Sequence, residues 1–342
     1  MSAFTIENED QLDDLLSEPT PEVVAALGRL SGDILVLGVA GKMGPSLARM
    51  ARRASDAAGI QRRVIGVARF SAGGQEALEA YGVETIQCDL HDEGAVVRLP
   101  EAENVIYMVG RKFGSTGEEY QTWATNCYVP ALICRKYRHS RIAAFSTGNV
   151  YGLAQADGGG SCESDSLAPV GEYAMSALGR ERLFEYFSRS QGTPLAIVRL
   201  NYACELRYGV LVDLAQRIQA GEPVDLSMGY LNTIWQGDAN AMTLCALEHV
   251  ASPPWTVNVT GPELLSVRSI CERLGELLDK LVRYTGIESD TAILSNVSRA
   301  TELWGTPRIG VDQLLTWIVD WVGRGGRSLG KPTHFESRDG KF

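Results

Sequence analysis

Residues 33–44, which read DILVLGVAGKMG, constrain the fold of this chain more than any other stretch of its sequence. Residues 34–37 form a short, continuous apolar run, which is the pattern of a strand buried on both faces of a parallel sheet. Three glycines follow at positions 38, 41 and 44, and residues 45–54 have the pattern of a helix. A strand, a glycine-rich turn and a helix in this order are typical of a dinucleotide-binding site.

Each glycine has a separate role in such a turn. Gly38 would permit the tight turn, Gly41 would let the backbone approach a pyrophosphate, and Gly44 would let the helix pack closely on the strand. The free N–H groups and the positive dipole end of the helix would then face the phosphates. We therefore predict a cofactor site at Gly38, Gly41, Lys42, Met43 and Gly44. The alternative is an ordinary glycine turn between a strand and a helix.

The composition of the 342-residue chain is that of a globular protein and excludes several classes of function. Hydrophobic residues make up 45% and charged residues 22%, which is enough for a large core. The net charge of −10 argues against nucleic acid as a partner, because nucleic-acid binding depends on Lys and Arg. No apolar run approaches the ~18 residues of a membrane span. Residues 1–14 lack the basic and apolar regions of a signal peptide.

Cysteine and histidine usage points to a reduced compartment. The seven cysteines are scattered without a Cys-x-x-Cys pair, and the four histidines show no clustered spacing. Structural disulfides and a structural metal are therefore not expected. We expect a cytoplasmic protein that binds neither a metal ion nor a membrane.

Strand and helix patterns alternate along the chain without long gaps. This indicates an α/β fold with a doubly wound parallel sheet, the Rossmann arrangement, and right-handed crossovers. The predicted later strands cover residues 63–68, 84–87, 104–109, 141–145 and 196–200, and the longest predicted helices cover residues 118–137 and 172–187. Residues 1–30 form a helical preamble with Thr20 as cap and Pro21 in the first turn, which we expect to pack against the main sheet.

The end of the second predicted strand bears on the choice of cofactor. In a dinucleotide fold, an acidic residue at this place binds the ribose 2′-hydroxyl of NAD. Here the place is taken by Ala68, and Arg69 follows it. A guanidinium without a carboxylate suits a 2′-phosphate, so we expect NADP, with NAD as the alternative. Arg69 could instead be a solvated loop charge.

Several further motifs extend the similarity beyond the glycine turn. With them, residues 33–325 resemble an extended short-chain dehydrogenase/reductase of the NAD-dependent epimerase/dehydratase family. Besides the three glycines, the matching pieces are Cys88-Asp89-Leu90, Asn126, STGNVYG at 146–152, Tyr173, the strand at 196–200, GEPV at 221–224, Asp238-Ala239 and NVTG at 258–261.

The resemblance implies a dinucleotide-binding domain over residues 31–202 and a smaller, interleaved substrate lobe over 203–330. It also implies cofactor contacts at Asp89, Leu90, Val109, Gly110 and Asn126. The helices at 118–137 and 172–187 resemble those that pair two subunits in this family, so we expect a homodimer. Residues 331–342 form a tail that is too polar to build a core, and we expect it to wrap the surface.

The resemblance also implies the chemistry. Family members transfer a hydride while a tyrosine takes or gives the hydroxyl proton of the substrate, and a neighbouring Ser or Thr holds the carbonyl oxygen. These residues correspond to Tyr173 and Thr147. A free phenol has a pKa of about 10 and needs help to ionise at neutral pH. The family lysine that gives this help corresponds to Ala177, so Lys112 is our first candidate for a replacement cation and Arg180 the second. Alternatively, neither cation reaches the site.

The residues after Thr147 bear on the reaction. Sugar-nucleotide dehydratases of the family have an Asp–Glu pair there, because loss of water needs an acid and a base. Gly148 and Asn149 cannot do this, which favours epimerisation or simple redox chemistry over 4,6-dehydration. We expect a sugar-nucleotide-like substrate, with contacts from Asn149, Asn201 and Arg207. The alternative function is a non-catalytic nucleotide sensor or partner-binding protein on the same fold.

Overall fold

The apolar run that follows Asp33 forms the central strand of the sheet. In the computed structural model, which describes residues 5–112 and 117–341, β1 (Ile34–Leu37) pairs in parallel with β2 (Val64–Ala68) and β4 (Asn104–Tyr107). The seven-stranded sheet has the order β12-β7-β5-β4-β1-β2-β3, and every neighbouring pair is parallel. The other strands are β3 (Glu84–Gln87), β5 (Arg141–Thr147), β7 (Leu195–Leu200) and β12 (Trp255–Val259). The predicted doubly wound parallel sheet is therefore confirmed.

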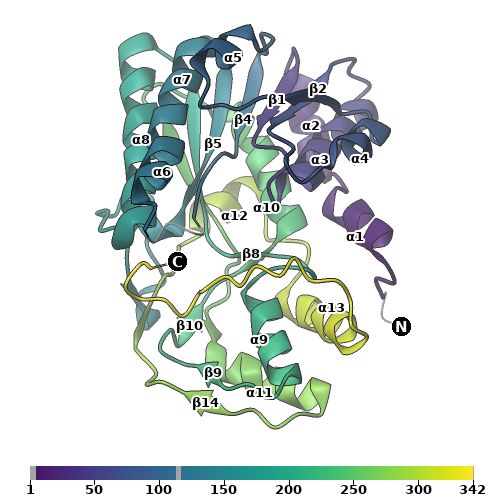
Figure 1. Ribbon diagram of the computed structural model, residues 1–342, viewed down its shortest axis with the longest axis vertical. Helices are drawn as coiled ribbons and strands as arrows, with labels where there is room; N and C mark the ends of the chain where they lie inside the picture. The colour runs from purple at the N-terminus through teal and green to yellow at the C-terminus, as the bar shows by residue number, and fades with distance from the viewer. Residues whose placement is uncertain (1–4, 113–116, 342) are drawn as a thin grey trace.

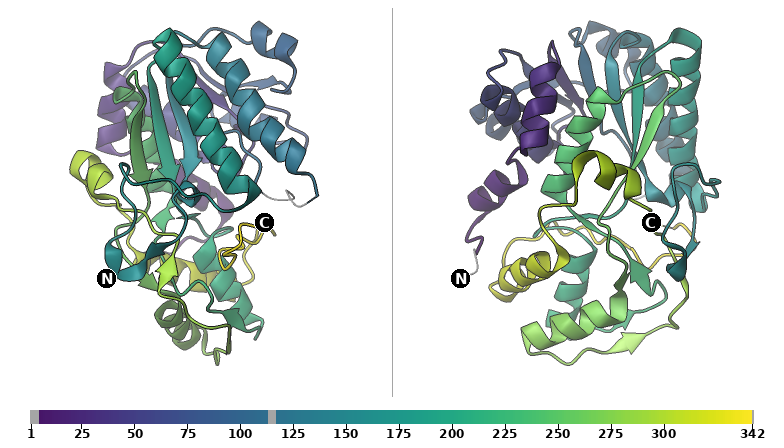
Figure 2. Two further views of the ribbon diagram at one scale, coloured as in Figure 1. Left: turned by 90° about the vertical axis from the view of Figure 1, so that its left-hand side faces the viewer. Right: turned by 180° about the vertical axis from the view of Figure 1, so that it is seen from behind.

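Helices cover both faces of this sheet and complete the larger lobe (Figure 1). One layer contains α3 (Gly44–Ala57) and α10 (Gln236–Cys245), which pack on the face that Val36 and Ile106 contribute to. The other layer contains α5 (Glu93–Arg98), α7 (Val129–Lys136) and α8 (Gly171–Gln191). The left-hand view of Figure 2 shows α7 and α8 side by side over this face. The short helix α4 (Gln75–Ala80) precedes β3, and α12 (Ser298–Trp304) packs on β12.

The smaller lobe lies below the carboxyl ends of the strands in Figure 1 and has its own core. Its helices are α9 (Val210–Gln219), α11 (Val267–Leu278) and α13 (Val311–Gly323). Two-residue strands pair as β9 (Val224–Asp225) with β14 (Tyr284–Thr285), β10 (Tyr230–Leu231) with β13 (Leu265–Ser266), β8 (Ala203–Cys204) with β11 (Ile234–Trp235), and β6 (Ala154–Gln155) with β15 (Thr291–Ala292). The two lobes alternate along the sequence, because α10, β12 and α12 belong to the larger lobe although they lie between segments of the smaller lobe.

The N-terminal preamble contacts both lobes. Thr20 caps α2 (Pro21–Arg29) as its sequence suggests, since its hydroxyl oxygen accepts a hydrogen bond from the N–H of Val23 at 3.2 Å. Helix α2 packs on α3 and α10, and α1 (Glu9–Leu16) contacts the same two helices. In addition, α1 contributes Leu12 and Leu16 to the core of the smaller lobe. Both helices of the preamble therefore pack on one helical layer of the main sheet, and α1 also reaches the smaller lobe.

Two other expectations differ in detail from the structure. The helix predicted over residues 118–137 consists of α6 (Glu119–Trp123), a π-helical turn (η1, Ala124–Tyr128) and α7. The polarity of the C-terminal tail predicts that it lies on the surface, but part of it is buried. Thr333 and Phe335 are both 3% exposed, and Phe335 belongs to the core of the smaller lobe. Short 3-10 helices occur at Gly148–Val150, Ala156–Gly158 and Ala246–Glu248.

Candidate dinucleotide and substrate site

The glycine turn lies at the point where the strand order reverses, between β1 and β4. In a doubly wound sheet, ligands bind outside the carboxyl ends of the strands at this point. Gly38 has φ +86°, and a Cβ there would lie 3.1 Å from the side chain of Val109. A Cβ on Gly44 would collide with the backbone of Val39, so only glycine allows α3 to approach β1 this closely.

The N-terminus of α3 suits a phosphate group. The side chain of the N-cap residue Met43 forms no hydrogen bond to the first turn, so the cap itself does not compete with a phosphate for those N–H groups. The nearest heavy atom to a Cβ on Gly41 would be the carbonyl oxygen of Gly38, at 3.2 Å. These features fit a pyrophosphate that approaches the turn and the helix dipole.

Arg69 and Asp89 follow the neighbouring strands β2 and β3. The guanidinium of Arg69 is exposed, and it acts on the Asp89 carboxylate through its charge. The carboxylate accepts a hydrogen bond from the N–H of His91 at 3.0 Å, and this bond is the main cause of the lowered pKa of Asp89. Leu90 is buried in the core beneath this edge. Arg69 and Asp89 therefore border the same end of the site, and Leu90 packs in the core beside them.

The loop after β4 is fixed from beneath by Asn126 and Arg180. The Asn126 side chain accepts from the N–H of Arg111 at 2.9 Å and donates to its carbonyl oxygen at 3.1 Å. Arg180 donates to the carbonyl oxygen of Val109 at 3.0 Å, and a Cβ on Gly110 would lie 2.9 Å from that guanidinium. Arg180 is thus a buried anchor for the loop, and we do not retain it as the replacement cation.

Thr147 lies at the carboxyl end of β5 with its hydroxyl oriented by Asn149. The Thr147 oxygen accepts from the Asn149 backbone N–H at 3.2 Å and from the Asn149 amide at 2.9 Å. A threonine hydroxyl has two acceptor positions and one donor. Because Asn149 uses both acceptor positions, Thr147 is set to donate its proton, as a carbonyl oxygen of a substrate would require.

Tyr173 lies in the first turn of α8 and has Lys112 beside it. The ammonium nitrogen of Lys112 is 5.9 Å from the centre of the Tyr173 ring. Burial lowers the pKa of Lys112 to about 8, while the charges of Asp213 and Glu336 oppose this shift. Ala177 is fully buried against Val150 and Tyr151. The glycines at positions 110 and 114 flank the loop that contains Lys112, so we expect this loop to fold closely over the cofactor, and its residues 113 and 114 lie outside the described residues.

Lys42 makes a contact that the sequence did not predict. Its ammonium nitrogen lies 3.3 Å from the centre of the Tyr208 ring, a cation–π contact that joins the glycine turn to the smaller lobe. Burial, together with repulsion from Lys112 and Lys331, lowers the pKa of Lys42 to about 7. Lys42 therefore faces the junction of the lobes.

The two predicted substrate contacts beyond β7 bind other parts of the protein. The Asn201 amide donates to the side-chain oxygen of Asn232 at 2.8 Å and lies against Gly148. The guanidinium of Arg207 forms ion pairs with Glu205 at 3.1 Å and with Asp13 of α1 at 2.8 Å. Arg207 therefore joins the preamble to the smaller lobe, and we do not retain it as a substrate contact.

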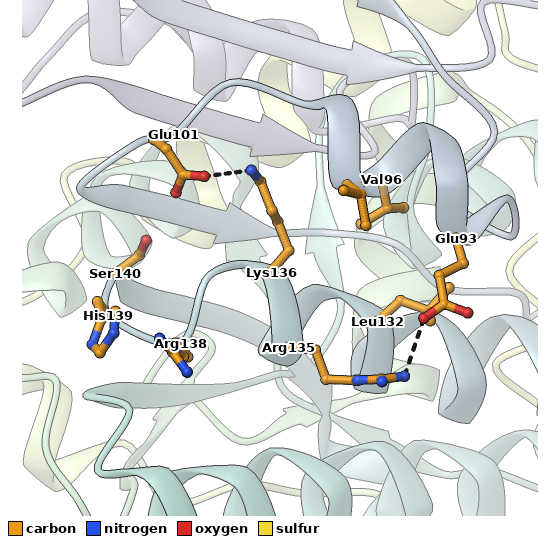
Figure 3. A pocket seen from close by; sticks show the side chains of 10 residues that line it. Glu93, Val96, Glu101, Leu132, Arg135, Lys136, Arg138, His139 and Ser140 are labelled. Atoms are coloured by element: carbon orange, nitrogen blue, oxygen red, sulfur yellow. Dashed lines mark hydrogen bonds and ion pairs between the residues drawn. The ribbon is translucent and has the colours of Figure 1, made fainter.

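Two cavities lie at different places relative to this site. One, of about 470 Å³, lies between α5 and α7 beside the start of β5 (Figure 3). It is at the amino end of the strands, and Arg135 and Lys136 form ion pairs there with Glu93 and Glu101. The second, of about 760 Å³, is bordered by Asn232, Ser295 and α12. It lies next to Gly148, because a Cβ on Gly148 would be 3.0 Å from the Ser295 hydroxyl oxygen.

Within residues 5–112 and 117–341, no helix has both the length and the apolar character needed to cross a membrane. The same part of the chain contains no group of three or more His, Cys, Asp or Glu side chains arranged to hold a metal ion. The residues at the glycine turn, in contrast, fit a dinucleotide.

The parallel sheet, its switch point and the glycine turn define a doubly wound protein of the Rossmann class. A sequence profile of the NAD dependent epimerase/dehydratase family matches residues 34–253. The chain therefore belongs to this family, as its motifs predicted. No curated protein matches it in sequence.

Solved structures of other proteins share the fold. UDP-glucose 4-epimerase from Thermotoga maritima, solved with UDP-glucose, has a TM-score of 0.71 and 20% identity over 85% of this chain and 99% of its own. UDP-glucuronic acid 4-epimerase from Bacillus cereus, solved with NAD, has a TM-score of 0.71 and 19% identity over 85% of this chain and 96% of its own. dTDP-glucose 4,6-dehydratase from Bacillus anthracis, also solved with NAD, has a TM-score of 0.72 and 15% identity over 86% of this chain and 97% of its own.

Proposed function

We propose that this protein is an NAD(P)-dependent oxidoreductase or epimerase that acts on a hydroxyl or carbonyl group of a sugar-nucleotide-like substrate. The observation that supports this most directly is the position of Lys112, whose ammonium nitrogen is 5.9 Å from the centre of the Tyr173 ring. A cation at this place favours a phenolate, which is the task of the lysine that Ala177 replaces. When bound, the dinucleotide would supply the acceptor or donor of a hydride.

In this proposal each protein residue has a defined task. Tyr173 takes the proton of the substrate hydroxyl during oxidation and returns it during reduction. Thr147 donates a hydrogen bond to the carbonyl oxygen, because Asn149 already occupies its acceptor positions. Asn126 and Arg180 keep the loop that contains Lys112 in place beside α8.

The surroundings of Gly148 support redox chemistry or epimerisation over dehydration. A side chain at this position would meet the Ser295 hydroxyl at 3.0 Å and Asn201 at 3.2 Å, so no carboxylate fits there without a rearrangement. The Asn149 amide is already bonded to Thr147. The amide and hydroxyl groups around the neighbouring 760 Å³ cavity suit a polyhydroxylated substrate.

The proposed activity can be tested with UDP- and dTDP-sugars, using a catalytic amount of dinucleotide for epimerisation and a stoichiometric amount of oxidised dinucleotide for net oxidation. Conversion to an epimer in the first assay, or to a keto product with matching reduction of the dinucleotide in the second, is expected for at least one sugar and can be followed by NMR. The Tyr173→Phe variant is expected to lose roughly 100-fold or more of this activity, because proton transfer contributes about 10²–10⁴-fold. Dinucleotide binding without conversion of any sugar, and without an effect of Tyr173→Phe, would favour the non-catalytic binding protein.

We infer that the cofactor is NADP. Ala68 provides no carboxylate for a ribose 2′-hydroxyl, and the exposed Arg69 can pair with a 2′-phosphate. In a fluorescence titration, NADPH is expected to bind at least about tenfold more tightly than NADH, since one charge-assisted bond contributes ~1.5–3 kcal/mol. Arg69→Ala should abolish the difference. Arg63→Ala, at the other end of β2, is the control, and a preference for NADH in both variants would reject the inference.

We also infer a homodimer formed through α6, α7 and α8. Leu132 and Phe184 of these helices are buried in the core, while Trp123 and Tyr128 are exposed, with Tyr128 48% exposed. Apolar side chains on both faces are expected where helices pack on a sheet and on a partner. Light scattering at micromolar concentration should give the mass of a dimer, and Tyr128→Glu should give a monomer. Leu281→Glu, in an exposed loop of the smaller lobe, should remain dimeric; a monomeric unaltered protein would reject the inference.

We place the protein in the cytoplasm. All seven cysteines are free thiols, and five of them are buried, which suits a reducing compartment.

A further inference from the structure

The C-terminal segment, residues 327–341, crosses the junction between the two lobes. Figure 1 shows it in yellow, from the end of α13 to the marked C-terminus. Near its start, the N–H of Leu329 donates to the carbonyl oxygen of Arg207 at 3.0 Å. Near its end, Gly340 lies against Val170 and Gly171, where α8 begins. The segment therefore connects the smaller lobe to the start of the helix that contains Tyr173.

Several contacts fix this segment in one position. The Phe335 side chain is buried in the core of the smaller lobe. Arg338 donates to the carbonyl oxygen and the hydroxyl of Thr291 at 2.7 and 2.6 Å. Glu336 forms an ion pair with Arg217 of α9 at 2.9 Å. His334 has φ +51°, a backbone conformation that persists only where the surroundings enforce it.

Thr333 connects a buried carboxylate of α9 to Lys112. Its N–H and its hydroxyl both donate to one carboxylate oxygen of Asp213, at 2.7 and 2.6 Å. Its carbonyl oxygen accepts a hydrogen bond from the ammonium of Lys112 at 3.1 Å. Asp213 thus determines where the Thr333 carbonyl lies, and that carbonyl helps to determine where the Lys112 ammonium lies.

We propose that Asp213 and Thr333 are positioning residues, through which the C-terminal segment completes the active site by holding the Lys112 ammonium beside Tyr173. This inference rests on the proposed function of the same site. The segment runs along the front of the molecule in Figure 1. Helix α12, which borders the 760 Å³ cavity, lies at the back and faces the viewer in the right-hand view of Figure 2. The residues that line this cavity lie between Ala156 and Glu302, outside the C-terminal segment.

The charges around Lys112 come from every element packed near it. Asp213 of α9 and Glu336 of the C-terminal segment stabilise the ammonium, whereas Lys42 of the glycine turn repels it. Tyr173 of α8 lies beside it. Burial raises the pKa of Asp213, and the two hydrogen bonds from Thr333 oppose this rise. A change in Asp213 or Thr333 should therefore alter the reactivity of the Lys112 amine.

The test measures this reactivity in the full-length protein without a substrate. Trace acetylation with acetic anhydride between pH 6 and 10, followed by mass spectrometry, measures the fraction of Lys112 that is deprotonated. In the unaltered protein the midpoint of this pH titration is expected near pH 8. Asp213→Asn should lower the midpoint by about one pH unit, the effect of removing a nearby opposite charge. Thr333→Val, which keeps the charge and nearly the shape, should make Lys112 react faster at a given pH. Glu222→Gln, an exposed carboxylate beyond α9, is the control and should change nothing.

Activity gives the second measurement. With a sugar nucleotide that the unaltered protein converts, Asp213→Asn and Thr333→Val should lower turnover and leave the affinity for the dinucleotide unchanged. Unchanged labelling of Lys112 in both variants would overturn the inference. So would a rise in turnover, which would mean that the segment blocks the site. If no sugar nucleotide reacts but the labelling responds as expected, the proposed function fails and the positioning of Lys112 stands. If Asp213→Asn does not fold, Thr333→Val decides.

Discussion

Replacing Glu181 with glutamine is expected to lower the free energy of unfolding by about 3–5 kcal/mol, the usual cost of removing one partner of a buried ion pair. Glu181 of α8 and Arg199 of β7 form a two-point pair, with N–O distances of 2.7 and 3.0 Å. Their side chains are only 4% and 7% exposed. The variant would leave the Arg199 guanidinium buried without a countercharge.

Further buried hydrogen bonds surround this ion pair. Ser146 donates to Glu181 at 2.5 Å, and Arg199 donates to the Tyr151 hydroxyl at 2.8 Å. Tyr151 in turn donates to the Asn258 side chain of β12 at 2.7 Å. The network therefore connects α8 to β5, β7 and β12 directly behind Thr147, and its loss should loosen the site as well as the fold.

The same helix provides a matched control. Glu185 lies one turn beyond Glu181, and its ion pairs with Arg182 and Arg189 are largely exposed. Glu185→Gln should change the free energy of unfolding by about 1 kcal/mol at most, because exposed pairs contribute little. Urea unfolding at pH 7, followed by tryptophan fluorescence, compares the two variants. Equal effects of Glu181→Gln and Glu185→Gln would show that the buried pair is not important for stability.

The parts of the fold that could be predicted from the sequence are those with local causes. The apolar run of β1 is continuous because both faces of the strand are buried, and Gly44 is required because α3 approaches Val39 closely. Thr20 and Pro21 mark the start of α2 by the requirements of its first turn. Each of these signals lies within a few residues of the structure that it determines.

The missed features depend on residues that meet only in the folded chain. Lys42 and Tyr208 lie far apart in the sequence, and no spacing pattern connects them. The tail is polar on average, but the alternate residues Thr333 and Phe335 face inward, so average polarity gave the wrong expectation. Arg180 lies on the same helix as Tyr173, yet its guanidinium binds the loop after β4. Sequence spacing identified the correct helix but not the direction of this side chain.

Lys112→Met is expected to lower turnover about 100-fold. The Lys112 ammonium lies 5.9 Å from the centre of the Tyr173 ring. If the phenolate charge is placed at the ring centre, the two charges interact by roughly 3 kcal/mol at an effective dielectric constant of ~20, which corresponds to ~100-fold in rate. Methionine keeps the length of the side chain and removes its charge. Because burial lowers the pKa of Lys112 to about 8, the ammonium is present below this pH and is lost above it. Turnover of the unaltered protein should therefore decline above about pH 8, and this decline should be absent in the variant.

Steady-state rates between pH 6 and 10, on a sugar nucleotide that the unaltered protein converts, provide the measurement. Lys280→Met, which removes an exposed charge from the smaller lobe, is the control and should leave the profile unchanged. Ala177→Lys is a poorer test, because Ala177 is fully buried against Val150 and Tyr151 and a longer side chain would overpack this region. Normal turnover in Lys112→Met, with its decline above pH 8 preserved, would exclude Lys112 as the cation that assists Tyr173.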